Sequence, residues 1–319
     1  MTTLAPLIET INGTMARLIA EDDKIVGRVS GYSLAGGGKR LRPLIFCLTA
    51  EAAGVRMTPE LYETASSFEL LHMATLLHDD IVDMAAVRRG LATAHLTFGV
   101  PETVLAGDYL LAKAAGLVAR TGNMDCVRIA TGVVAALSLG ELMQLGSRRK
   151  TEQSETDYFR IIYRKTAALI EGAAKNAAIL AEVSPEARAQ AARYGRKLGL
   201  AFQIMDDILD YQGDQAALGK PVGQDLAEGN ITLPFIRARE ALAGAPRERL
   251  CELASRPDLN EADRAEILAL VAAGGGLTSS RLTADELARE AVTCLKALPA
   301  TEARDRLEAL ALYAVKRDR

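Results

Sequence analysis

Residues 70–90 read LLHMATLLHDDIVDMAAVRRG, an apolar helical pattern that three aspartates interrupt. Apolar residues recur at three- and four-residue spacing, which is typical of a buried helix. In a helix Asp79 and Asp83 lie one turn apart on one face, roughly 6 Å along the axis, with Asp80 beside them. His72 joins this stripe from two turns away. Because clustered carboxylates repel and burial makes each one costlier, the pattern predicts a bound cation.

A second stretch, residues 199–213 or GLAFQIMDDILDYQG, repeats the same spacing. Asp206, Asp207 and Asp210 are flanked by apolar residues, and Gln203 falls on the same helical stripe. A solvated acidic helix face would explain one such cluster, but two copies inside apolar helices favour a functional site. Carboxylate oxygens suit Mg²⁺, which shares its coordination shell with waters and substrate phosphates. We therefore expect Mg²⁺ at both clusters.

Basic residues accompany both acidic clusters. The turn AGGGKRLRP, residues 35–43, precedes an apolar helix, so its glycines, cations and helix N-terminus could cradle a diphosphate. Such a turn, or any one of these cations alone, could equally be an ordinary surface feature. Beside paired acidic clusters they predict an anionic substrate bridged by Mg²⁺. The basic and polar candidates, taken along the chain, are Lys39, Arg40, Arg42, Arg88, Arg89, the pair Lys165–Thr166 and Lys220.

The composition supports a helical protein and excludes some classes of function. The chain has 319 residues, with 38 Lys and Arg against 41 Asp and Glu, so it lacks the basic excess of a nucleic-acid-binding protein. Its apolar residues are mostly aliphatic, since aromatics make up 4% and Trp is absent. Strand patterns are almost missing, and no linker divides the chain. We expect an all-α bundle in a single domain, residues 1–319, with helices over 59–84, 103–120, 124–147, 156–181, 185–213 and 283–298.

Signals for export, membrane spanning and metal-binding cysteines are missing from the sequence. The N-terminal residues lack the basic start and continuous apolar run of a signal peptide, and the richest apolar stretch is interrupted by Glu141. The four cysteines stand far apart with no CxxC pair, which favours free thiols over a zinc site or disulfides. We therefore expect a cytoplasmic protein with no membrane span.

In their order along the chain, these motifs resemble the signature of the trans-isoprenyl diphosphate synthases, also called polyprenyl synthetases. The resemblance covers roughly residues 30–240 and rests on GGGKRLRP, LLHDDIVD followed by RRG, the KT pair, FQIMDDILD and GKPVGQDLAEGNITLP. It implies an isoprenoid-synthase helical bundle around a deep central cavity, usually as a homodimer. It also implies three Mg²⁺ ions with substrate bound.

The resemblance implies a role for each matching residue. Asp79 and Asp83 resemble ligands of two Mg²⁺ ions, with Asp80 alongside; Asp206 resembles the ligand of a third, with Asp207 beside it and Asp210 acting through water. The residues that resemble contacts to the allylic diphosphate are Arg88, Lys165, Thr166, Gln203 and Lys220. Those that match the pocket for isopentenyl diphosphate are Lys39, Arg42, His72 and Arg89, with Arg40 in the same turn. Asn230 departs from the pattern, because many members carry a second loop lysine there.

The implied activity is condensation of isopentenyl diphosphate with an allylic diphosphate, farnesyl or geranylgeranyl, to an all-trans polyprenyl diphosphate. A tail growing away from the metals would pass Thr75, Ala74, Leu71 and Ser67, and no aromatic residue blocks this path before Phe68. The DDIVD motif also lacks the two-residue insertion of common bacterial farnesyl synthases. Both features resemble long-chain members, such as octaprenyl diphosphate synthases that make quinone side chains, and the lipophilic product would be released to a membrane.

Three alternatives remain open at this stage. A short-chain farnesyl or geranylgeranyl synthase would share every motif named above. A terpene cyclase shares the fold, but its second metal motif is usually of NSE type, and its cavity tends to be lined by aromatic faces that this chain is poor in. A non-catalytic subunit of a heteromeric synthase would have degraded aspartate clusters, and both clusters are intact here.

Overall fold

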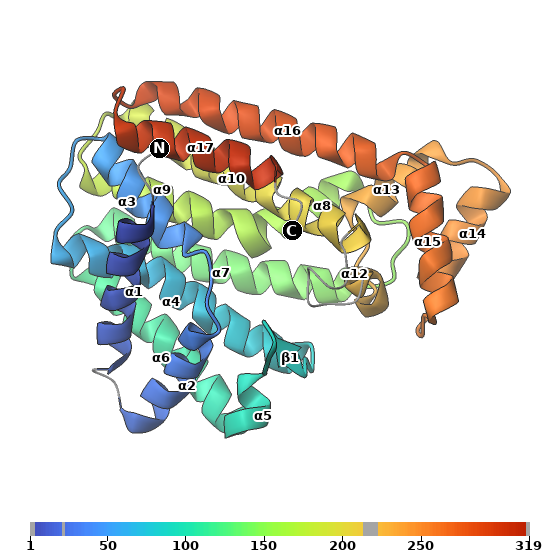
Figure 1. Ribbon diagram of the computed structural model, residues 1–319, viewed down its shortest axis with the longest axis horizontal. Helices are drawn as coiled ribbons and strands as arrows, with labels where there is room; N and C mark the ends of the chain where they lie inside the picture. The colour runs from blue at the N-terminus through green and yellow to red at the C-terminus, as the bar shows by residue number, and fades with distance from the viewer. Residues whose placement is uncertain (1–3, 21–22, 213–222, 317–319) are drawn as a thin grey trace. The chain divides into compact units, whose positions relative to one another are not determined.

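The computed structural model describes residues 4–20, 23–212 and 223–316, and in these ranges the chain is helical apart from one two-stranded hairpin (Figure 1). The elements are α1 (Ala5–Ala20), α2 (Lys24–Ala35), α3 (Leu41–Ala52), α4 (Pro59–Val82), β1 (Val87–Arg88), β2 (Leu91–Ala92), α5 (Ala94–Phe98), α6 (Val100–Ala119), α7 (Met124–Ser147), α8 (Glu155–Ile162), η1 (Tyr163–Ala167), α9 (Ala168–Leu180), α10 (Pro185–Gln212), α12 (Gln224–Glu228), α13 (Leu233–Ala241), α14 (Ala245–Ala254), α15 (Glu261–Ala273), α16 (Gly276–Cys294), η2 (Leu295–Ala297) and α17 (Glu302–Lys316). The expected all-α class is confirmed.

The chain divides into two compact units. Unit 1 comprises Met1–Ala135, Leu169–Ala192 and Lys296–Leu307. Unit 2 comprises Ala136–Ala168, Arg193–Leu295 and Glu308–Arg319. The long helices α7 and α10 contribute residues to both units. The single-domain organisation stays a prediction.

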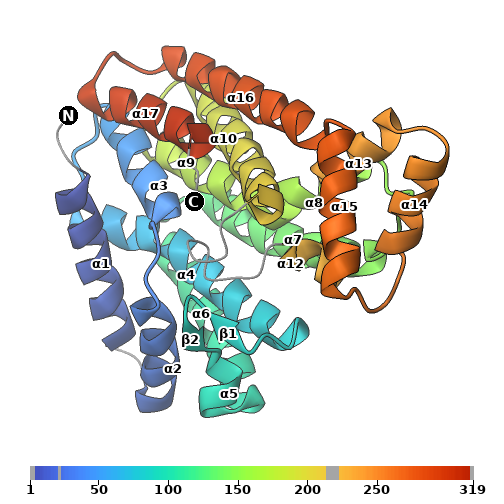
Figure 2. The same cartoon turned by 45° about the vertical axis from the view of Figure 1, so that its right-hand side comes forward.

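Unit 1 is organised around α4, which packs along α6 and also contacts α1 and α3 (Figures 1 and 2). The helix begins where Thr58 accepts a hydrogen bond from the Leu61 amide at 3.4 Å and Pro59 occupies the first turn. Its middle is buried on every side, since Thr64 through Leu71 are all inaccessible. Pro59 and Glu60 at its start and Val82 at its end are exposed, so solvent reaches the helix mainly at its two ends.

Unit 2 is built on an apolar cluster that joins α10 to the helices that follow it. Ile204 and Ile208 of α10 are buried together with Phe235 of α13 and with residues of α14, α15 and α16. The glycine run at residues 274–276 has a packing reason, because a Cβ on Gly276 would lie 2.0 Å from the Pro234 carbonyl oxygen. Only glycines allow α13 and α16 to approach this closely.

Two local features depart from the periodicity. Instead of one helix over 156–181, the chain forms α8, a π-helical turn at Tyr163–Ala167, and α9. A Cβ on Gly140 of α7 would lie 2.8 Å from the Lys165 backbone nitrogen, and one on Gly199 of α10 would lie 2.5 Å from the Ala167 Cα. The turn thus lies against two backbones. The second feature is the hairpin, in which Val87 pairs with Ala92 and Arg88 with Leu91.

The helix α7 is more apolar than its interruption by Glu141 led us to expect. It is the one helix in the described ranges that is long and apolar enough to cross a membrane, with a mean hydropathy of 1.6 over its richest window, of which 28% is buried. The pair α15 and α16 passes the same test only as a span bent by 62°. A core or interface helix passes it too, so the predicted lack of a membrane span stays a prediction.

Candidate active site

The first aspartate cluster lies at the C-terminal end of α4, where the helix dipole is negative. Asp79 and Asp80 fall in the last turn and Asp83 is the C-cap, and α4 has no basic residue in this turn. Carboxylates are unfavourable at this end of a helix, because the terminal carbonyl groups carry partial negative charge. The cluster therefore depends on positive charge supplied from outside the helix.

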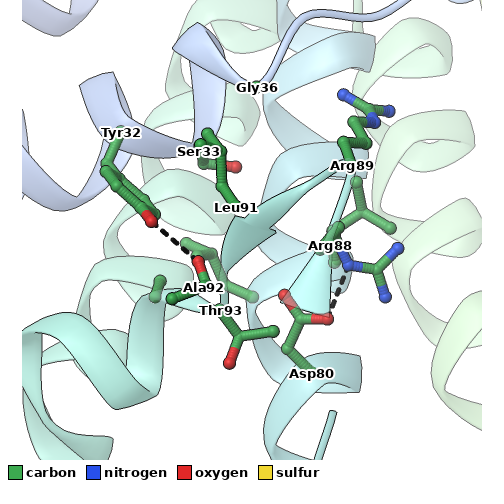
Figure 3. Close-up of a pocket in the computed structure, with 12 residues that line it drawn as sticks. Tyr32, Ser33, Gly36, Asp80, Arg88, Arg89, Leu91, Ala92 and Thr93 are labelled. Carbon is green, nitrogen blue, oxygen red and sulfur yellow. Dashed lines mark hydrogen bonds and ion pairs between the residues drawn. The ribbon is translucent and has the colours of Figure 1, made fainter. Parts of the chain in front are cut away.

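The hairpin after α4 supplies part of that charge. Arg88 on β1 turns back, and its Nε donates to Oδ1 of the buried Asp80 at 2.5 Å (Figure 3). Asp80 is thereby committed to a guanidinium of the same chain. Asp79 and Asp83 are half-buried at the helix end. They are the two carboxylates of this cluster that best fit the role of metal ligands.

A small pocket of about 30 Å³ lies between the hairpin, α2 and α4 (Figure 3). Tyr32 of α2 donates its hydroxyl hydrogen to the Ala92 carbonyl at 2.8 Å. This bond fixes the hairpin against α2, and with it Arg88. The residues that line the pocket include Tyr32, Gly36, Asp80, Arg88, Arg89 and Ala92.

Arg40, which the sequence predicts to bind substrate, is held by contacts within the protein. It is buried at the start of α3 in a left-handed conformation, with φ at 49°. Its Nε donates to Asn12 Oδ1 at 2.8 Å, and its Nη2 donates to the Leu34 carbonyl at 3.1 Å. Its Nη1 lies 3.5 Å from the buried carboxylate of Glu69. The guanidinium thus anchors the glycine-rich turn, and its expected part in substrate binding stays a prediction.

Glu69 is a functional candidate that the sequence reading missed. Its buried carboxylate also lies 3.9 Å from Arg42 Nη1, so one anion serves two arginines of the turn. Arg89 reaches the same turn from the hairpin and donates to the Gly37 carbonyl. Gly38 has φ at +147°, and a Cβ there would lie 3.0 Å from Arg40 Nη1. A lone glutamate in the apolar run FELLH was the available signal. Lys39 is exposed on this turn.

His72 faces this group of arginines and is held neutral by it. Burial lowers its pKa well below the usual value, and the positive charges of Arg42, Arg89, Arg88 and Arg40 lower it further. At neutral pH the imidazole can therefore donate or accept a hydrogen bond but adds no charge. The positive charge near His72 comes from arginines.

The second cluster lies near the C-terminal end of α10, which also has no basic residue in its last turn. Asp207 is buried and accepts hydrogen bonds from the Tyr158 hydroxyl at 2.6 Å and from Gln203 Nε2 at 2.8 Å. Burial raises the pKa of Asp207 to about 7, although both hydrogen bonds act to lower it. Thr166 donates to Gln203 Oε1 at 2.7 Å. Thr166, Gln203 and Asp207, which the sequence predicted as site residues, thus form one hydrogen-bonded network. Tyr158 also belongs to this network, and the sequence did not indicate it.

Asp210 and Asp206 differ in their surroundings. The two oxygens of Asp210 accept hydrogen bonds from the backbone amides of Gln224 and Asp225, both at 3.1 Å, so this carboxylate caps α12. Asp206 is half-buried at the same end of α10. The structure therefore adds an organising role to the metal role expected of Asp210.

Asn230, which stands where many relatives of this pattern carry lysine, helps to hold α12. Its Nδ2 donates to Glu228 Oε2 at 3.1 Å and to Asp225 Oδ1 at 3.4 Å. The uncharged side-chain amide thus donates hydrogen bonds to these carboxylates, whereas a lysine would pair with them as a cation. Lys220, predicted to contact the allylic substrate, lies outside the described residues.

The carboxylates present fit a hard divalent cation. No group of three or more His, Cys, Asp or Glu side chains in the described ranges is arranged to hold a metal by itself. Mg²⁺ does not require such a group, because it commonly takes one or two carboxylates and completes its shell with water and substrate phosphates. Asp79 and Asp83 in unit 1, and Asp206 in unit 2, fit that mode of binding.

The residues expected to set product length line one side of α4 within unit 1. Leu71, Ala74 and Ser67 are buried, and Ser67 donates to the Thr64 carbonyl at 2.6 Å. Thr75 is half-buried and donates to the His72 carbonyl at 2.9 Å. Phe68, the first aromatic on the way down the helix, packs on Phe46 with ring centroids 6.2 Å apart. Their role in chain length stays a prediction, as does the central cavity.

Comparison with known proteins decides the family. The polyprenyl synthetase family model matches residues 23–271. The chain belongs to the polyprenyl synthetase family. It is 37% identical to the octaprenyl diphosphate synthase of Escherichia coli over 97% of this chain and 95% of that protein. It is 36% identical to a short chain isoprenyl diphosphate synthase of Methanothermobacter thermautotrophicus over 91% of this chain and 90% of that protein.

The fold agrees with the solved structures of the polyprenyl synthetase family. The crystal structure of a polyprenyl synthase from Caulobacter crescentus, complexed with calcium and isoprenyl diphosphate, matches with a TM-score of 0.91 and 35% identity. The match covers 99% of this chain and 96% of that one. The protein is thus a prenyltransferase with the all-α fold of the polyprenyl synthetases, and divalent metal use is typical of its family.

The partly buried His72 predicts a loss of stability in acid. Its folded pKa lies below its unfolded value of about 6.5, so the stability it contributes is present above that pH and is lost as the pH falls toward the folded pKa. The loss has a slope of at most about 1.4 kcal/mol per pH unit. Between pH 7.5 and pH 5.5, the free energy of unfolding measured in urea should fall less for His72→Gln than for the wild type. The control His78→Gln, a part-exposed histidine, should keep the wild-type loss; equal losses in all three proteins would contradict this assignment.

Proposed function

We propose that this prenyltransferase is Mg²⁺-dependent and condenses isopentenyl diphosphate with farnesyl or geranylgeranyl diphosphate to a long-chain all-trans polyprenyl diphosphate. The product would be of the octaprenyl type used for quinone side chains. The observation that carries this proposal is the pair of aspartate clusters, each at the negative end of a long helix that has no basic residue in its last turn. Such clusters are suited to a substrate that arrives with divalent cations.

The residues of each unit would act on the diphosphate groups of the substrates. Three Mg²⁺ ions, held by Asp79 and Asp83 and by Asp206, would neutralise the allylic diphosphate and make it a better leaving group. The residues proposed to bind that diphosphate are Arg88, Lys165, Thr166, Gln203 and Lys220. Those proposed to bind isopentenyl diphosphate are Lys39, Arg42, His72 and Arg89. Arg40 and Glu69 would hold this second group in place.

The reaction would proceed by ionisation, condensation and elimination. The allylic C–O bond breaks, and the cationic side chains stabilise the departing diphosphate. The double bond of isopentenyl diphosphate then attacks the allylic cation and forms the new C–C bond. The released diphosphate takes the proton that is lost, which restores a double bond. Water must be excluded throughout, because it would quench the cation.

Loss of either metal cluster should abolish turnover without unfolding the protein. In the presence of Mg²⁺, Asp79→Ala and Asp206→Ala should each lower the turnover of farnesyl diphosphate with isopentenyl diphosphate by at least about 100-fold. The reason is that the leaving group loses its charge stabilisation. Product chromatography and circular dichroism would be measured together. Asp125→Ala, which removes an exposed carboxylate paired with Arg128, should keep wild-type turnover. Near-normal turnover by either cluster variant, or a cyclic hydrocarbon from the wild type, would exclude the proposal.

The long-chain assignment rests on the small residues of α4. The 36% identity to a short-chain relative shows that overall identity is not a guide to product length. What supports a long product is the absence of an aromatic side chain at positions 74 and 75.

Replacing Ala74 by Phe should shorten the product. The added ring would stand in the path of the growing tail one helical turn below Asp79. Because Ala74 is buried, Thr75→Phe at a half-buried neighbouring position provides a second variant with less disruption of packing. Chromatography of the dephosphorylated products is the measurement. The same product length from the wild type and both variants would refute the open path.

We further propose that the protein is a cytoplasmic homodimer that releases its product to a membrane. Leu105 and Tyr109 on α6, and Leu139 and Leu142 on α7, are exposed large apolar side chains. A second copy of the chain is the occupant that would cover such residues. All four cysteines are free thiols, which fits a reducing compartment.

A charge on the exposed face of α7 should disrupt the dimer. Leu142 is 66% exposed, and Leu142→Asp should convert a species of twice the 34.1 kDa chain mass into one of the chain mass. Light scattering during size-exclusion chromatography is the measurement. Leu282→Asp on α16, where the leucine is 62% exposed, is the matched control and should stay dimeric. A wild type that is already monomeric would rule out the dimer.

A further inference from the structure

Lys165 is held by a carboxylate that neither the sequence motifs nor the family signature singled out. Its Nζ lies 2.8 Å from Oε2 of Glu141 on α7. Both groups belong to unit 2, and both are partly shielded, with 30% of the lysine side chain and 15% of the glutamate side chain exposed. With both side chains partly shielded from water, an ion pair at this distance is stronger than an exposed surface pair.

The position of this pair is set by backbone packing. Lys165 lies in the π-helical turn, and Gly140, the residue before Glu141, lies directly against that turn. A Cβ on Gly140 would lie 2.8 Å from the Lys165 backbone nitrogen. The two backbones are thus in van der Waals contact where the two side chains leave them. Isolated π-helical turns occur often at functional sites, because they redirect side chains out of the α-helical register.

Apart from its pairing with Lys165, a carboxylate at the position of Glu141 lowers the stability of the fold. Its second oxygen, Oε1, is buried and accepts no hydrogen bond from any described residue. The neighbouring residues of α7 are largely apolar, and leaving a carboxylate oxygen without a partner costs stability. A glutamine or an apolar residue would satisfy packing at lower cost, so packing alone does not explain a carboxylate here.

We propose that Glu141 is the positioning residue for Lys165, a step that rests on the proposed function. Its carboxylate fixes the direction of the ammonium group, so that the charge is already aimed when the allylic diphosphate binds. An ammonium carries three donors, so a bond to Glu141 does not prevent it from binding an anion. A flexible lysine that is oriented beforehand loses less conformational entropy when it binds and when the leaving group departs.

The test is a steady-state comparison of the wild type with Glu141→Gln, in which each substrate is varied in turn. The change keeps the size of the side chain and removes its charge. We expect kcat/KM for the allylic substrate to fall by about 10- to 100-fold and KM for isopentenyl diphosphate to stay unchanged. Glu155→Gln is the matched control, because Glu155 pairs with Arg237 at 2.7 Å in the same unit and should affect neither constant.

A second background separates positioning from a purely structural role. Lys165→Met should be impaired by itself, and adding Glu141→Gln to it should cause no further loss in kcat/KM, because the group to be positioned is gone. An additive loss, a rise in KM for both substrates, or wild-type kinetics for Glu141→Gln would each overturn the proposal. If Glu141→Gln does not fold, as judged by circular dichroism, Glu141→Asp keeps the charge and should show an intermediate loss. A wild type with no turnover would instead overturn the proposed function.

Discussion

Repulsion among carboxylates at the negative ends of helices is the constraint on which the rest of this structure depends. Asp79, Asp80 and Asp83 end α4, and Asp206, Asp207 and Asp210 lie near the end of α10. Both helices are held by apolar packing along their length, so they cannot relax by fraying away from the charges. The cost is therefore permanent, and nearby positive charge lowers it.

Each unit reduces that cost in its own way while keeping some carboxylates for function. In unit 1 the hairpin brings Arg88 back to Asp80, and Tyr32 holds the hairpin in position. In unit 2 hydrogen bonds from Tyr158 and Gln203 satisfy Asp207, and backbone amides of α12 satisfy Asp210. Asp80 in unit 1, and Asp207 and Asp210 in unit 2, are thus partly structural.

Buried anions organise the cations in the same manner. Glu69 lies between Arg40 and Arg42, and Glu141 holds Lys165. A cation that binds diphosphate must stay charged and point in one direction, and a fixed carboxylate secures both. Close backbone contacts at glycines set these geometries: Gly38 admits two guanidinium groups, and Gly140 admits the π-helical turn. Arg40 holds the turn that precedes Arg42, and its expected part in substrate binding stays a prediction.

The helical class, the two aspartate clusters and most of the basic residues could be read from the sequence, because helical periodicity and like-charge spacing are local properties. The π-helical turn could not, since the glycines of α7 and α10 that lie against it are far away in sequence. The resemblance set Asp80 apart from Asp79 and Arg40 from Arg42, but the sequence does not give the physical basis of either distinction. The distinction depends on which group Arg88, Glu69 or Asn12 reaches, and only tertiary structure places those partners, because long-range contacts leave no periodic signal along the chain.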